Sequence, residues 1–153
     1  LRQGPEDLRF PAFLGILHYP PDVALPLIGD SLDTIQPVHL GNICFRLSQL
    51  KDRRATQLIV KAIQRMDPRS KSRGISYLQR QNTQAAARAL AGLHKHKEPA
   101  VRRAAQDALR RMKHPEAKKI LQQLGVPPAQ KPPKQDNSPF LGTDGSAPTP
   151  VLY

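Results

Sequence analysis

The sequence has few aromatic residues, one cysteine and no tryptophan. Only three Tyr and four Phe occur in 153 residues, so the core must be built from Leu, Ile, Val and Ala, a set that suits helices packed closely through small residues. The single cysteine, Cys44, excludes an internal disulfide, and no spacing of Cys and His resembles a structural zinc site. Its place on an apolar helical face predicts a small core residue.

Motifs that carry chemistry are also missing. No apolar run reaches the roughly 18 residues that a membrane-spanning helix needs, so no transmembrane segment is predicted. The sequence has no glycine loop that could cradle a phosphate, no nucleophile in a recognisable setting and no HExxH. His94, His96 and His114 lack the acid or cysteine that would complete a zinc site, and Asp30 with Asp33 reads as a solvated pair. We therefore expect no enzymatic activity, no cofactor and no small-molecule substrate.

Acidic residues are scarce in one part of the chain only. The net charge is +12, from 24 Lys and Arg against 12 acids. Residues 1–45 hold two bases and five acids and are acidic, whereas residues 46–119 hold twenty bases and five acids and carry a charge of +15. Ion pairing within that stretch cannot neutralise so large an excess. This charge indicates a polyanionic partner.

The dominant feature that is present is a repeat of 31 residues. Several columns keep this offset, and they read Pro37, Pro68, Pro99; Leu47, Leu78, Leu109; Ala24, Ala55, Ala86, Ala117; and Ile28, Ile59, Leu90, Leu121. Columns that share one offset over four copies indicate supersecondary units stacked on one another. The sequence therefore predicts an all-α fold, an alpha-solenoid of about four two-helix repeats.

The prolines divide the predicted solenoid, residues 1–125, into units of about 6–36, 37–67, 68–98 and 99–125. The first helix of the third unit is the weakest, because residues 71–74 supply little apolar surface. Residues 126–153 hold seven prolines and no apolar period, which predicts an extended Pro-rich tail. We expect the tail to dock on a partner through its apolar residues, which are Phe140, Leu141, Val151, Leu152 and Tyr153.

Two stretches resemble known helical repeats. The sequence EPAVRRAAQDALRRMKHPEAKKILQQL, from Glu98, resembles short HEAT-like repeats, in which an acid and a proline precede Val-Arg, paired alanines and leucine. The sequence HLGNICFRLSQL, from His39, followed by RATQLIVKAIQRM, is similar to octotricopeptide and FAST-kinase-like organellar repeats. The first resemblance implies a binding scaffold, and the second implies an organellar RNA-associated protein.

Basic residues recur on the predicted helices of the last three units. Arg54, Lys61 and Arg65 share a narrow sector of one helix, and Arg103 with Arg110 lies opposite the core of another. The candidate nucleic-acid-binding residues are Arg54, Lys61, Arg65, Lys71, Arg73, Arg80, Arg88, Arg102, Arg103, Arg110, Arg111, Lys113, Lys118 and Lys119. Such a surface suits a phosphate backbone, although solvated helix faces are the ordinary alternative. Tyr77 is expected to pack at an edge, so backbone binding is favoured over base stacking.

These features predict a non-catalytic, RNA-backbone-binding structural subunit of a ribonucleoprotein, most plausibly an organellar (mitochondrial) ribosome. The expected partners are ribosomal RNA and neighbouring proteins of a large assembly. An adaptor that binds an acidic protein is the main alternative, and a helical subunit of a membrane-bound respiratory assembly is a third. The chain starts at Leu1, and a removed organellar presequence or a fragment of a longer protein would each explain this. The predicted location is mitochondrial, and another organelle or the cytoplasm are the alternatives.

Overall fold

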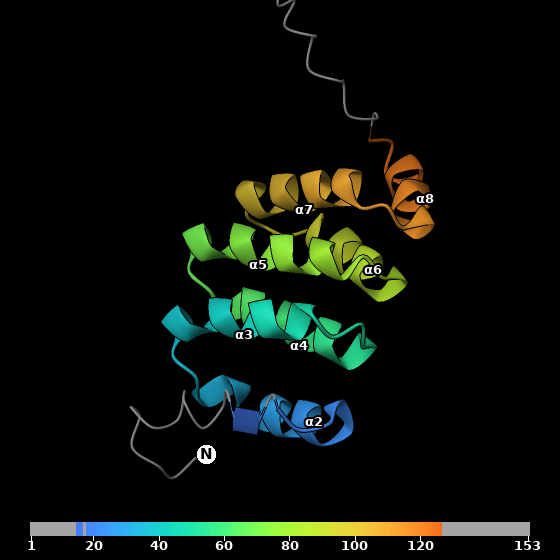
Figure 1. The fold of residues 1–153 in the computed structure, drawn as a ribbon. Helices are drawn as coiled ribbons and strands as arrows, with labels where there is room; N and C mark the ends of the chain where they lie inside the picture. Colours follow the sequence, from blue (N-terminus) through green and yellow to red (C-terminus); the bar gives the residue numbers. More distant parts are fainter. Residues whose placement is uncertain (1–14, 17, 127–153) are drawn as a thin grey trace, which may run out of the picture.

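The computed structural model describes residues 15–16 and 18–126, and all the regular secondary structure of these residues is helical. Within these residues, the elements from α2 onward are seven α-helices and two short 3-10 helices. Figure 1 shows their order along the chain. Their bounds are α2 Pro21–Ser31, η1 Leu32–Thr34, η2 Pro37–His39, α3 Leu40–Ser48, α4 Arg53–Arg65, α5 Pro68–Gln81, α6 Gln84–Leu93, α7 Pro99–Arg111 and α8 Pro115–Gln123. No helix in this part of the chain is long and apolar enough to cross a membrane.

The helices are stacked in two rows. Helices α3, α5 and α7 pack side by side in one row, and α2, α4, α6 and α8 form the second row behind it (Figure 1). Successive helices alternate between the rows, so that α3 pairs with α4, α5 with α6 and α7 with α8. This arrangement confirms the predicted all-α solenoid.

The helix pairs fall inside the predicted units, with α3 and α4 in 37–67, α5 and α6 in 68–98, and α7 and α8 in 99–125. The division of the chain into a repeat domain and a tail stays a prediction. The proposed tail anchors, Phe140, Leu141, Val151, Leu152 and Tyr153, lie outside the described residues, and so do residues 6–14 and 17 of the first predicted unit.

Short polar residues and prolines set where the helices begin. Asp52 accepts a hydrogen bond from the backbone N–H of Arg54 (2.7 Å), and Asp67 accepts two from the start of α5. Proline occupies the first position of α5 and α7, where its missing N–H costs no intrahelical bond. Pro37 differs, because it opens the 3-10 turn η2 and the α-helix starts only at Leu40.

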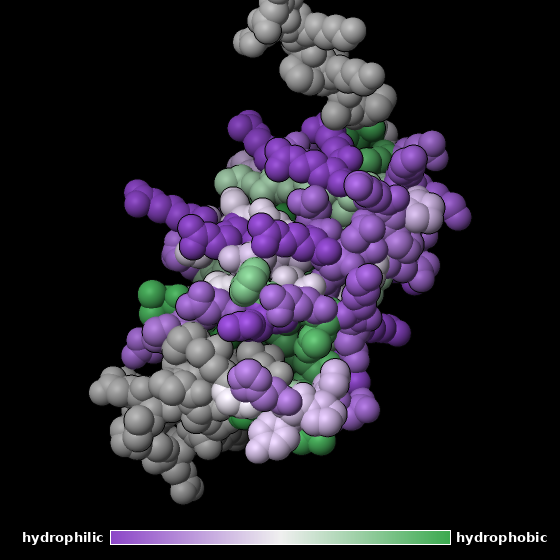
Figure 2. Space-filling view, viewed as in Figure 1, coloured by the Kyte–Doolittle hydropathy of each residue, from purple (hydrophilic) through white to green (hydrophobic). Residues whose placement is uncertain are grey.

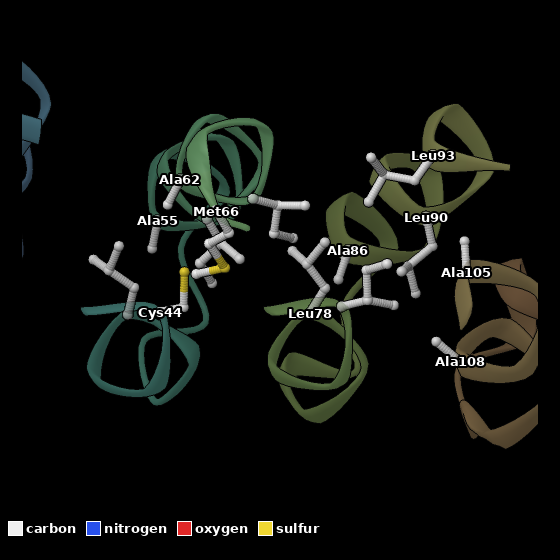
Figure 3. Close-up of a cluster of buried hydrophobic side chains, with 14 of the residues drawn as sticks. Cys44, Ala55, Ala62, Met66, Leu78, Ala86, Leu90, Leu93, Ala105 and Ala108 are labelled. Atoms are coloured by element: carbon white, nitrogen blue, oxygen red, sulfur yellow. The ribbon is translucent and has the colours of Figure 1, made fainter. Parts of the chain in front are cut away.

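The repeated columns form the core. The alanines of the 31-residue register, Ala24, Ala55, Ala86 and Ala117, are each at most 1% exposed. The aliphatic residues of the next column, Ile28, Ile59 and Leu90, are fully buried, and Leu121 packs partly buried against them. Figure 3 shows Ala55, Ala86 and Leu90 of these columns pointing into the space between neighbouring helices. The small residues therefore set the helix spacing, and the large ones fill what remains.

Helix α5 is held in the stack by residues that an apolar pattern overlooks. Gly74 faces α4, and a Cβ added there would lie 2.6 Å from Cγ1 of Ile63. Gln81 is 2% exposed and donates from Nε2 to the carbonyls of Leu47 (3.2 Å) and Leu50 (2.8 Å), which end α3. Its Oε1 accepts from the Thr56 hydroxyl at 2.9 Å. The helix that the sequence makes weakest is thus fixed by close backbone approach and by buried hydrogen bonds.

Candidate binding surfaces

Two of the predicted RNA-binding cations on α4 are paired with acids of the first unit. Arg54 Nη2 lies 2.7 Å from Asp22 Oδ1 and 2.7 Å from Asp52 Oδ2. Lys61 Nζ lies 2.7 Å from Asp33 Oδ2. Both cations remain about half exposed, with 47% and 44% of their side chains accessible. The acidic first unit therefore neutralises two of the four cations of α4 from across the repeat boundary.

Two further candidates serve the stack more directly. Arg65 donates to the carbonyls of Leu32 and Ile35, so that it caps the end of η1 in the preceding repeat. Lys71 does not lie on the surface as expected, because its side chain is only 9% exposed and its Nζ pairs with Glu98 Oε1 at 2.5 Å. This contact ties the first turn of α5 to the start of α7. The charge of Lys71 is therefore neutralised by Glu98 within the protein.

The remaining paired candidates lie on α6 and α7. Arg88 Nε lies 3.0 Å from Glu116 Oε1, a contact between α6 and α8. Arg102 donates to the carbonyls of His96 and Lys97 before its own helix. Arg110 pairs with Asp107 at 3.1 Å within α7.

All five acids between residues 46 and 119 have a partner inside the protein. Asp52, Glu98, Asp107 and Glu116 pair with cations, and Asp67 caps α5. Hydrogen bonds from Lys71 and from Arg88 hold the pKa values of Glu98 and Glu116, respectively, below the usual range of a Glu carboxyl. Because these carboxylates are engaged, none is left for the cations that lie elsewhere on the last three units.

A group of arginines on the outer side of α5 and α7 has no acidic partner among the described residues. These residues, which we call the arginine crest, are Arg69, Arg73, Arg80, Arg103 and Arg111, and all are exposed. Arg69, Arg73 and Arg80 fall within a sector of roughly 40° on α5, since each residue turns the helix by about 100°. The face over α5 and α7 carries strongly hydrophilic side chains (Figure 2). The crest thus places five exposed arginines on two adjacent helices.

The aromatic residues near the crest are packed against each other. The rings of Phe45 and Tyr77 meet edge to face, with centroids 5.7 Å apart, and the guanidinium of Arg80 lies 5.6 Å from the Tyr77 centroid. Tyr77 is half-buried, as predicted for an edge residue. With its ring engaged by Phe45 and Arg80, it is poorly placed to stack on a base.

The last three candidates lie away from the crest. Lys118 and Lys119 are exposed on α8, in the second row, and Lys113 is exposed in the loop before it. The backbone N–H groups of Lys113 and His114 donate to Oδ1 of Asn82, both at 3.0 Å. Asn82 has a left-handed backbone, φ 48°. This contact orders the loop and leaves the lysine side chain in solvent.

A groove of about 410 Å³ runs between α4 and α6 in the second row. Arg53, Gln57 and Val60 line its α4 side, and Gln84, Arg88 and Ala89 are among the residues that line its α6 side. A smaller depression of about 190 Å³ lies between α5 and α7 beside the crest, and Ser72, Ser76 and Arg111 are among the residues that line it. The first groove has an apolar floor between polar rims, and the second is polar.

The described residues offer no group of three His, Cys, Asp or Glu that could hold a metal ion. The histidines act as turn caps, since His96 Nδ1 accepts from the Glu98 N–H and His114 Nδ1 from the Glu116 N–H, both at 3.2 Å. Cys44 is fully buried as predicted, and burial raises the pKa of its thiol to about 12. A thiol in that state is a core residue and not a nucleophile.

Sequence reasoning missed Arg53 in the groove and Arg69 on the crest. Arg69 stands four residues before Arg73, a spacing that places two residues on one helix face, so this signal could have found it. Arg53 gave no such signal, since its neighbours across the groove lie about one repeat away. Whether any of these cations binds RNA stays a prediction.

Comparison with known proteins identifies the type of helical repeat. Residues 56–130 match the family model described as HEAT repeats. This confirms the HEAT-like resemblance, whereas the octotricopeptide and FAST-kinase-like resemblance stays untested. Searches of curated proteins and of solved structures found no match.

Proposed function

Because the chain is a HEAT-like helical-repeat protein, we propose that it is a non-catalytic scaffold whose arginine crest binds the phosphate backbone of RNA. The family match supports the scaffold and protein partners. The observation that supports RNA is the crest itself, with five exposed arginines on two adjacent helices and every nearby acid engaged elsewhere. Arginine grips phosphate oxygens with paired N–H groups, and repeated cations suit a ligand whose charge also repeats.

The composition of the crest favours RNA over an acidic protein. Stable protein interfaces bury an apolar centre inside a polar rim. The apolar surface beside the crest is small, because Tyr77 is packed against Phe45 and Arg80 and leaves Phe45, 37% exposed, as a single apolar side chain there. A phosphate backbone needs no apolar pocket, and it releases counterions when cations bind it. The ligand fits the surface by charge alone.

The proposal includes a ribonucleoprotein, and most plausibly a mitochondrial ribosome, as the assembly in which the scaffold acts. This part rests on the basic repeats together with the resemblance of residues 39–66 to organellar RNA-associated repeats. Neighbouring proteins would then contact the helix faces that the RNA leaves free.

The experiment measures the affinity of a fluorescein-labelled single-stranded RNA of about 20 nucleotides by anisotropy over a range of KCl concentrations. The crest variant combines Arg69→Gln, Arg73→Gln, Arg103→Gln and Arg111→Gln. The control variant removes four exposed charges elsewhere, with Lys95→Gln, Lys97→Gln, Lys118→Gln and Lys119→Gln. Each lost phosphate contact lowers the slope of log K against log salt by about 0.7, so the crest variant should lose a slope of roughly 3.

The control variant should keep most of the slope, although its net charge is the same. Equal losses in the two variants would show that the total charge and not the crest binds RNA, and would overturn the proposal. Recovery of partners from cells with and without ribonuclease gives a second test. Partners that resist ribonuclease but require the crest arginines would point to an acidic protein as the ligand of the crest.

A further inference from the structure

The groove between α4 and α6 carries features that the RNA proposal leaves unused. It holds about 410 Å³ and lies in the second row of helices, whereas the crest lies on α5 and α7 in the first row. Two arginines line it from opposite helices, Arg53 from α4 and Arg88 from α6. Val60 and Ala89, both half-buried, contribute apolar surface between them.

The two arginines are available to a ligand in different ways. Arg53 is exposed and has no ion pair with any residue in the described part of the chain. Arg88 contacts Glu116 through Nε, and its side chain remains 66% exposed. A guanidinium has five N–H donors in a planar fork, so the terminal nitrogens of Arg88 stay free to bind a second carboxylate. Glu116 shows that a carboxylate fits beside this arginine.

The walls of the groove suit an extended peptide backbone. Gln57 and Gln84 are exposed and line it from the two helices, and the Gln84 side chain also interacts with the Glu116 carboxylate. Each side-chain amide presents a donor and an acceptor, which is the complement of the donor and acceptor on every residue of an extended chain. The apolar floor would receive one side chain of the peptide, as in other modes of peptide recognition in which side-chain pockets give specificity.

We propose that this groove binds an extended acidic segment of a partner protein, in which carboxylates flank an apolar residue. The carboxylates meet Arg53 and Arg88, and the apolar side chain lies on Val60 and Ala89. RNA does not fit this site equally well, because the apolar floor of Val60 and Ala89 offers nothing to a phosphate backbone, whereas it can receive an apolar side chain of a peptide. The proposal is independent of the crest, so the scaffold would hold RNA and protein on different rows.

The test uses the full chain and a fluorescein-labelled peptide of about ten residues in which Glu residues flank a central Leu. Two peptides serve as controls, one with Lys in place of Glu and one with Ser in place of Leu. We expect the Glu–Leu peptide to bind, the Ser peptide to bind at least several-fold more weakly, and the Lys peptide not to bind. Equal binding of the Leu and Ser peptides would overturn the proposal, since charge alone would then explain it.

Variants locate the site and separate it from the crest. Arg53→Gln with Arg88→Gln should weaken peptide binding at least tenfold, and Ala89→Trp should block it by filling the floor. The crest variant should bind the peptide within about twofold of the parent protein and should fail only with RNA. Peptide binding that depends on the crest and not on the groove would contradict the inference. Loss of RNA binding alone would leave it standing.

One substitution should improve binding. Glu116→Gln removes the carboxylate that competes for Arg88, so the peptide should bind more tightly. Asp33→Asn makes the same change of net charge at Lys61, away from the groove, and should leave the peptide affinity near that of the parent. Equal tightening in both variants would mean that net charge is responsible and would count against the site. Melting temperatures of all variants confirm that each is folded at the temperature of the assay.

Discussion

The junction between α2 and α4 and the crest on α5 and α7 use similar cations for different purposes. On α4, Arg54 and Lys61 each lie 2.7 Å from a carboxylate of the first unit, Asp22 and Asp33. On the crest, Arg73 and Arg103 are exposed and form no ion pair with any acidic residue in the described part of the chain. The number of basic residues is therefore a poor guide to a binding surface. What separates the two regions is where the acids lie.

The comparison also gives a role to the acidic first unit. In the sequence it stands out only as the end of the chain with a net negative charge. In the structure its carboxylates reach across the repeat boundary and pair with two of the four cations of α4. The positive surface over α4 is consequently weaker than the sequence predicts.

The largest expected effect comes from breaking the stack while leaving the crest intact. Gln81→Ala removes a buried side chain together with its three hydrogen bonds, so that the Leu50 carbonyl loses its side-chain donor, while the Thr56 hydroxyl keeps the Asp52 carbonyl and the Leu47 carbonyl keeps the Leu50 N–H. We expect a loss of about 3 kcal/mol in the free energy of unfolding, measured by urea denaturation. Gln64→Ala, on the exposed face of α4, should change it by less than about 0.5 kcal/mol. A similar small loss at Gln81 would contradict the role of its hydrogen bonds.

The next effect distinguishes two helical glycines. Gly74→Ala places a methyl group 2.6 Å from Cγ1 of Ile63, so the clash should outweigh the gain in helix propensity and destabilise the protein by about 1–2 kcal/mol. Gly92 on α6 has nothing within 4 Å of a Cβ, and Gly92→Ala should stabilise by about 0.5–1 kcal/mol. Thermal melting measures whether each substitution raises or lowers the stability of the protein. Stabilisation by Gly74→Ala would show that α4 and α5 are not packed as described.

Ion pairs that differ in burial should differ in effect. Lys71→Ala breaks a pair in which the lysine side chain is 9% exposed, whereas Lys61→Ala breaks one that is 44% exposed. Water screens the second pair more strongly, so we expect the melting temperature to fall clearly more for Lys71→Ala. Neither change should weaken RNA binding by the folded protein, because neither lysine belongs to the crest. Equal shifts in melting temperature would place Lys71 on the surface, as the sequence predicts.

The smallest effect is on the acid side of the pH profile. The Lys71 hydrogen bond lowers the pKa of Glu98, so the charged carboxylate stabilises the fold. That stability is complete above the usual Glu pKa of roughly 4.3, and it is lost as the pH falls through the lower pKa of the folded state. Glu98→Gln should therefore show a shallower decline of melting temperature between about pH 5 and pH 3. An unchanged profile would mean that the pair contributes nothing.

The fold could be predicted because columns of alanine and aliphatic residues that repeat at one offset are compatible with few architectures other than a solenoid. The polar contacts of α5 could not be predicted, because Gln81 and Gly74 only interrupt the apolar pattern in the sequence. Their roles become clear from their contacts with α3 and α4 in the structure. The same limit applies to the basic surface. Arg65 contacts Leu32, and Lys71 contacts Glu98, so each has its partner about one repeat away in the sequence. Such contacts depend on how neighbouring helices are rotated against each other. The spacing of residues within one helix carries no information about that rotation.

The claim that crest cations bind a ligand while junction cations hold the stack is tested by comparing two variants of equal charge. One is the crest variant, and the other combines Arg54→Gln, Lys61→Gln and Arg65→Gln at the junction with Arg88→Gln, which breaks the ion pair between α6 and α8. The measurement is the RNA affinity of each variant together with its melting temperature. We predict that the crest variant loses RNA binding at an unchanged melting temperature, and that the second variant melts lower but binds RNA when folded. Equal loss of RNA affinity in both would contradict the claim.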